Sequence, residues 1–215
     1  MSNDTMLQQA VLAELSWEPS VTAGHIGVTA NSGVVTLTGH VGTFAEKWAA
    51  EAAAGRVKGV KAVAEEIEVK LPFSMKRTDD QIAEAVLDRL AWDVSVPKDR
   101  VKVKVEDGRV TLTGEVDWHF QSDAAEDACR RLYGVVSVFN QIAIKPKVQP
   151  LEIKEKIRTA LHRSWYEPVN VTVSADGGKV RLTGSVRTWY ERQQAETAAW
   201  GAPGVTQVDD SITIS

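Results

Sequence analysis

Apolar residues in this chain follow a helical period in three places, and each of these stretches is followed by residues that alternate between apolar and polar. The helical stretches share an apolar residue at every fourth position: Leu7, Val11 and Leu15, then Ile82, Val86 and Leu90, then Ile153, Ile157 and Leu161. This spacing puts the apolar side chains on one face of a helix. The alternation is clearest in 101–105 and 171–173. It predicts half-buried strands after each helix.

A five-residue motif on the predicted second strand shows that one unit is repeated. It reads VTLTG in 35–39 and 110–114, and VRLTG in 180–184. A Gly-Val pair begins twenty residues after each motif glycine; the glycines are Gly39, Gly114 and Gly184 in the motifs and Gly59, Gly134 and Gly204 in the pairs. Three identical spacings indicate a tandem repeat. Breaks at prolines divide the chain into modules 1–72, 73–148 and 149–215.

Each module is expected to contain a helix, two strands, a second helix and a third strand. Glycine with Asn, Ser or Asp separates the first two strands and suits a tight hairpin turn. Alanine-rich helices are expected over 45–57, 124–132 and 192–200. The predicted fold class is therefore α+β, as three tandem α-β-β-α-β modules in which two helices pack on a three-stranded sheet.

The strand motif, the alanine-rich helix, the Gly-Val pair and the short last strand together resemble the BON domain, a family named for bacterial osmotically inducible and nodulation proteins. The resemblance covers nearly the whole chain in three copies. It implies a non-enzymatic, stress-associated protein that contacts phospholipid surfaces or protein partners. A self-assembling structural protein and a potassium-binding module are the alternatives. Family members often carry Asn on the last strand, where this chain has Asn140 in module 2 but Glu65 and Asp210 in the other modules.

Composition narrows the possible functions. The chain has 215 residues, 43% of them hydrophobic and 25% charged, and a formal net charge of −4. These values are ordinary for a folded domain and argue against a disordered or a basic, nucleic-acid-binding protein. No apolar run approaches the roughly 20 residues of a membrane-spanning helix. The first residues lack the pattern of a secretory leader, so we expect a cytoplasmic protein, or a periplasmic one if a leader has been removed.

Residues with catalytic or metal-binding chemistry do not fall into recognisable motifs. The four histidines (His25, His40, His119 and His162) lack the spacing of zinc ligands, and no phosphate-binding glycine loop is present. Cys129 occupies an alanine position of the second helix and is expected to be a buried filler. The motif glycines are interpreted as structural, leaving room for the alanine-rich helix. We therefore expect no enzymatic activity, no cofactor and no metal.

Aromatic residues offer the best candidates for binding. Trp17, Trp92 and Trp165 follow the first helix of each module and are interpreted as lids over the core. A second set lies between the second strand and the alanine-rich helix: Phe44, Trp118, His119, Phe120, Trp189 and Tyr190. Residues of this kind at a turn contact lipid or a protein partner, or else fix the angle at which the helix begins, and the sequence leaves both interpretations open.

Two lysines add charge to the aromatic candidates of module 2. Lys102 and Lys104 share one face of a predicted strand. Such a row is typical of a solvated sheet edge, but it also suits phosphate head groups. The predicted binding residues are therefore Trp118, Phe120, Lys102, Lys104, Trp189 and Tyr190, and the expected partners are a phospholipid surface, another protein or a second copy of the chain.

Overall fold

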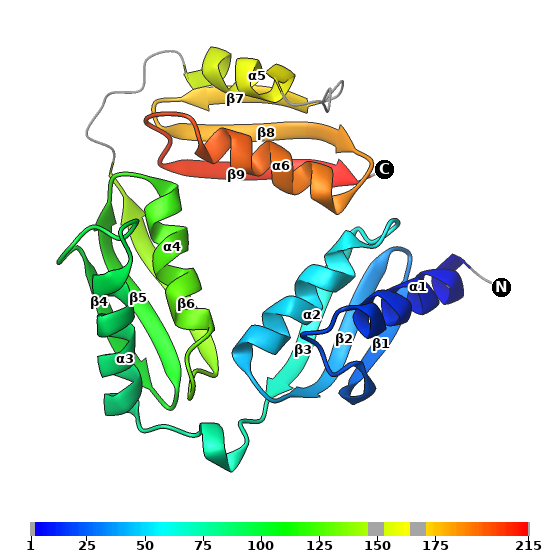
Figure 1. The fold of residues 1–215 in the computed structure, drawn as a ribbon. Helices are drawn as coiled ribbons and strands as arrows, with labels where there is room; N and C mark the ends of the chain where they lie inside the picture. The colour runs from blue at the N-terminus through cyan, green and yellow to red at the C-terminus, as the bar shows by residue number, and fades with distance from the viewer. Residues whose placement is uncertain (1–2, 146–152, 164–170, 215) are drawn as a thin grey trace.

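Three modules with the same order of elements make up the computed structural model, which describes residues 3–145, 153–163 and 171–214 (Figure 1). Module 1 contains α1 (Asn3–Trp17), β1 (Ile26–Asn31), β2 (Val34–Val41), α2 (Phe44–Arg56) and β3 (Ala62–Val69). Module 2 contains α3 (Asp79–Trp92), β4 (Val101–Glu106), β5 (Arg109–Val116), α4 (His119–Arg130) and β6 (Ser137–Ile144). Module 3 contains α5 (Ile153–Arg163), β7 (Val171–Asp176), β8 (Lys179–Val186), α6 (Trp189–Trp200) and β9 (Gln207–Ile214). Short 3-10 helices cover Ala23–His25 and Phe73–Met75.

Each sheet has its second strand in the middle. The first strand pairs with it antiparallel, through a tight hairpin, and the third strand pairs with it parallel. Parallel pairing of strands needs a connection that crosses over the sheet, and the second helix of each module supplies it. The α+β class and the α-β-β-α-β order expected from the sequence are confirmed.

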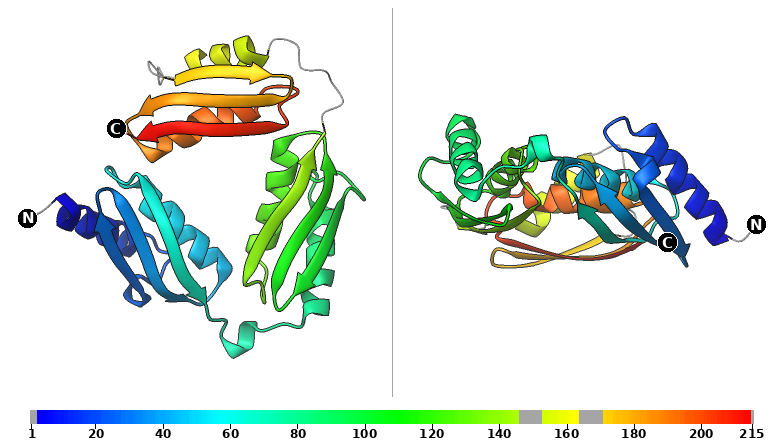
Figure 2. Two further views of the ribbon diagram at one scale, coloured as in Figure 1. Left: turned by 180° about the vertical axis from the view of Figure 1, so that it is seen from behind. Right: turned by 90° about the horizontal axis from the view of Figure 1, so that it is seen from below.

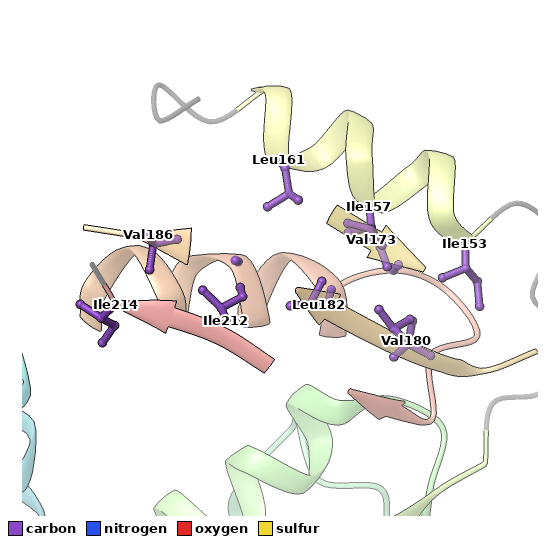
Figure 3. Packing of buried hydrophobic residues seen from close by; sticks show 13 residues of the cluster. Ile153, Ile157, Leu161, Val173, Val180, Leu182, Val186, Ile212 and Ile214 are labelled. Atoms are coloured by element: carbon purple, nitrogen blue, oxygen red, sulfur yellow. The ribbon is translucent and has the colours of Figure 1, made fainter. Parts of the chain in front are cut away.

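Both helices of a module pack on the same face of its sheet. The hydrophobic core lies between this face and the two helices, as Figure 3 shows for module 3. The central leucine of each middle strand is fully buried: Leu37, Leu112 and Leu182. Of the nine apolar residues predicted on the first helices, eight are buried and Leu7 is partly buried. A capping box of Thr78 and Gln81 begins α3. Cys129 is buried beside Val110 and Leu112 in the module 2 core, as expected.

The motif glycines are required for a different reason than the one expected. Gly39, Gly114 and Gly184 have φ angles of 113°, 139° and 125°. A Cβ atom on Gly114 would lie 2.0 Å from the carbonyl oxygen of Arg100, and one on Gly39 would lie 2.1 Å from that of His25. The interpretation that the missing side chain admits the alanine-rich helix is therefore wrong. The glycine lets the backbone before the first strand approach the middle strand.

The second helices begin earlier than predicted, at the aromatic residues themselves. Thr43 and Thr188 accept hydrogen bonds from the backbone N–H groups of Glu46 and Glu191, so they cap α2 and α6. Capping at these positions places Phe44 and Trp189 in the first helical turn rather than in the preceding loop. The aromatic candidates thus have directions fixed by a helix.

The three modules form a flat triangle (Figures 1 and 2). The second helices α2, α4 and α6 lie on its inner side, and the first helices α1, α3 and α5 lie on its outer side. Module 3 returns to module 1, because α6 contacts α2. The predicted module boundary near 146–150 and the tryptophan predicted as a lid at 165 lie outside the described residues.

Candidate functional site

Equivalent positions of the second helices meet where two modules join. One position is the fifth residue after the motif glycine of a module, and the other is the sixteenth residue after the motif glycine of the neighbouring module. His119 of module 2 stacks on Trp200 of module 3, with ring centroids 3.9 Å apart. Trp189 of module 3 lies on Gly55 of module 1, where a Cβ would be 3.3 Å from the indole Cδ1. Two of the three junctions therefore use the same two positions with different chemistry.

The junction between modules 1 and 2 uses the same two helix positions, and one of them carries a charged residue, Arg130. Phe44 packs against the core of module 2, and the guanidinium of Arg130 lies over the ring of Trp48, 4.9 Å from its centroid. Arg130 occupies the same position in its module as Gly55 and Trp200. The aromatic set between strand and helix thus contributes to all three contacts between modules.

A groove opens beside the junction of modules 2 and 3. Its volume is about 540 Å³. It is lined by Trp118, His119, Phe120 and Asp123 from module 2 and by Gln193, Glu196, Thr197, Trp200 and Gly201 from module 3. Phe120 is 55% exposed, whereas the other two rings of its segment are half-buried. The groove brings two predicted binding residues, Trp118 and Phe120, together with residues of the next module that no sequence pattern indicated.

The other predicted binding residues lie elsewhere. Lys102 and Lys104 are exposed on the edge strand β4, on the sheet face that the helices leave uncovered. Trp189 is at the junction with module 1, and Tyr190 next to it is exposed. The six residues therefore belong to three places and do not form one site.

The tryptophans at the ends of α1 and α3 are exposed, so the interpretation of these two as lids is wrong. Trp17 is 86% exposed and Trp92 is 87% exposed. Val94 is fully exposed two residues later, and Lys98, Lys102 and Lys104 are exposed as well. We call 92–104, in which Val96 is the buried residue, the exposed segment of module 2. It begins with apolar side chains in water and continues with lysines.

A polar contact joins the last strand to the second helix in every module. Asn140 accepts a hydrogen bond from the Ile142 N–H (3.1 Å), and its amide donates to Ser122 Oγ (2.8 Å). The carboxylates that replace Asn140 make the same strand bond: Glu65 to the Ile67 N–H and Asp210 to the Ile212 N–H. The helix partner changes with them, to Lys47 (2.8 Å) and Arg192 (2.7 Å). Each carboxylate therefore has a basic partner on the helix, which forms a charge-assisted hydrogen bond with it, whereas the neutral amide has a hydroxyl.

Replacing Asn140 by Asp is expected to destabilise module 2 by about 2 kcal/mol, because the new carboxylate would face Glu126, whose Oε2 now accepts from the amide at 3.0 Å. Adding Ser122→Lys copies the pair of module 1 and should restore at least half of the loss. Urea unfolding of the wild type, Asn140→Asp and the double variant measures both effects. A double variant no more stable than Asn140→Asp would contradict the pairing.

Titratable groups in the part of the chain that the structure describes do not gather into a reactive site. Burial raises the pKa of the Cys129 thiol to about 12, which keeps it protonated and unreactive. On the exposed side of α2, partial desolvation raises the pKa of Glu51, and the nearby Glu65 carboxylate adds to the shift. Within the described ranges, no group of three or more His, Cys, Asp or Glu side chains could hold a metal ion. None of the helices that the structure describes is both long and apolar enough to cross a bilayer.

Comparison with known proteins agrees with the repeated fold. The BON domain matches residues 3–70, 78–146 and 151–215. The chain belongs to the BON-domain family. This BON-domain chain is 33% identical over 147 residues to "Osmotically-inducible protein Y" of Escherichia coli K12, covering 66% of this chain and 73% of that protein. It is 29% identical over 143 residues to "21 kDa hemolysin" of Actinobacillus pleuropneumoniae, covering 65% and 73%. A solved structure of CdsD, a structural protein of the type III secretion system of Chlamydia trachomatis, aligns over 98% of this chain and 92% of its own, with 16% identity and a TM-score of 0.27.

Proposed function

We propose that this BON-domain protein is a non-catalytic, stress-associated protein that binds phospholipid surfaces through the exposed segment of module 2. The stress association rests on its similarity to Osmotically-inducible protein Y. The observation that carries the lipid proposal is the exposure of Trp92 and Val94 directly before three exposed lysines. Apolar side chains in water are unfavourable unless a partner covers them, and tryptophan favours the boundary between head groups and acyl chains.

The charge of the exposed segment supports a membrane as the partner. Residues 92–104 contain four basic and two acidic side chains, for a net charge of +2. The matching segment of module 1, 17–29, contains one acidic side chain and no Lys or Arg, for a net charge of −1. Lysines close to an anionic membrane contribute about 1 kcal/mol each. Module 2 therefore combines an apolar anchor with a basic stretch, whereas module 1 has the tryptophan alone.

Sedimentation with vesicles of phosphatidylethanolamine and phosphatidylglycerol tests the proposal. Trp92→Ala is expected to lower the partition coefficient about tenfold, because most of one large apolar side chain no longer leaves water. Lys102→Gln with Lys104→Gln is expected to cause a similar loss at low salt and little loss at high salt, where charges are screened.

Trp17→Ala is the matched control, because it removes an equally exposed tryptophan from the same position of module 1. It should change binding by less than about twofold. No sedimentation of the wild type with vesicles, or equal losses for Trp17→Ala and Trp92→Ala, would reject the exposed segment as a lipid-binding site. Self-assembly through sheet edges and potassium binding stay predictions.

A further inference from the structure

We infer that the groove between modules 2 and 3 binds a methylated ammonium cation, such as the trimethylammonium group of choline. Three aromatic rings and an imidazole line the groove: Trp118, Phe120 and Trp200, with His119. Aromatic faces carry a negative potential, and quaternary ammonium ions are the ligands that aromatic cages bind. The volume of about 540 Å³ is within the usual range for small-molecule sites.

The charges of the groove favour a cation. Asp123 and Glu196 line its two walls, and no Lys or Arg is among the lining residues that the structure describes. Asp123 also pairs with Nδ1 of His119 at 2.7 Å, and its side chain is 52% exposed. Glu196 accepts a hydrogen bond from the Trp200 indole N–H at 3.4 Å. Both carboxylates are therefore held beside aromatic rings and remain available to a bound cation from one side.

An inorganic cation fits the groove poorly. The two carboxylates come from different helices and do not belong to a group of three or more possible ligands, so a metal ion would lack the oxygen shell it needs. A methylated ammonium ion is large and weakly hydrated, and its methyl groups can lie on Trp118 and Phe120 while its charge faces the carboxylates. This combination selects an organic cation over a metal or a primary ammonium ion.

The groove exists only where two modules meet. Module 2 supplies the start of α4, and module 3 supplies the second half of α6. The stack of His119 on Trp200 joins the two walls (3.9 Å between ring centroids). A bound cation would contact both modules at once, so binding should also stabilise this junction by mass action.

Calorimetry with choline chloride on the whole chain tests the site, with sodium chloride at the same concentration as the reference. Saturable binding of choline is expected, and phosphocholine and phosphatidylcholine vesicles show whether the natural source is a free molecule or a lipid head group. Phe120→Ala should weaken choline binding about tenfold, and Glu196→Gln about fivefold. Phe120 is exposed, so its replacement leaves the core intact.

Trp92→Ala separates this site from the lipid proposal. It removes the exposed tryptophan outside the groove and should leave choline affinity unchanged, whereas Phe120→Ala should leave sedimentation with choline-free vesicles unchanged. Absence of saturable choline binding would overturn the inference, and so would choline binding that Phe120→Ala and Glu196→Gln do not weaken. Neither result would affect the lipid proposal, which rests on other residues.

Discussion

Gly114→Ala is expected to unfold module 2 while leaving the other modules folded. The φ angle of Gly114 is 139°, and a Cβ would lie 2.0 Å from the carbonyl oxygen of Arg100 and 3.1 Å from its carbonyl carbon. The obstacle is the backbone immediately before β4, which cannot move without disturbing the pairing of Val101 with Gly114. Backbone strain of this kind costs about 3 kcal/mol before the clash is counted, a large part of the stability of a small module.

Differential scanning calorimetry would show this loss as a separate transition at lower temperature. Gly24→Ala is the control, because a Cβ there would meet no atom within 4 Å and the residue has no positive φ. It should melt like the wild type. A Gly114→Ala protein with an unchanged transition would show that the strand contact can relax and that the fold does not require the motif glycine.

Trp189→Ala is expected to open the triangle. Module 3 reaches module 1 through the indole of Trp189, which lies on Gly55 of α2, and chain connectivity joins these two modules only by way of module 2. Losing the indole removes apolar contact area from this junction, so modules 1 and 3 should separate. Small-angle X-ray scattering would show an increase of several ångströms in the radius of gyration.

A second variant tests the same contact from the other side. Gly55→Leu puts a side chain where a Cβ already lies 3.3 Å from Trp189, and it leaves the core of module 3 untouched. It should expand the molecule as Trp189→Ala does. Tyr190→Ala is the control, because its exposed ring is the next one along the same helix. Unchanged scattering of both Trp189→Ala and Gly55→Leu would mean that other contacts hold the triangle closed.

The fold of each module could be predicted because its signals are local and repeat three times. The apolar spacing of the first helices, the alternation of the strands and the turn glycines each specify an element without reference to distant residues. The starts of the second helices were missed although Thr43 with Glu46 and Thr188 with Glu191 are helix-capping pairs. Module 2 has Trp118 instead of threonine at the N-cap position, so the capping pair is not common to the three modules.

The exposure of Trp92 could also be predicted from the sequence. Leu90 is buried, and two residues along a helix turn the side chain by about 200°, to the opposite face. The junctions could not be predicted in the same way. Phe44, His119 and Trp189 occupy one position, yet they contact different partners far along the chain, so only the packing of whole modules brings each pair together.

The polar contact between last strand and second helix bears on how three similar modules avoid exchanging strands during folding. A strand carrying Asn140 that docked on module 1 would leave Lys47 without its carboxylate, and a strand carrying Glu65 that docked on module 2 would face Glu126. Tandem repeats are prone to such exchanges, because their equivalent surfaces are alike in shape. Each mismatch would leave a half-buried charge unpaired, so the differences at this position direct the strand of module 2 to its own sheet.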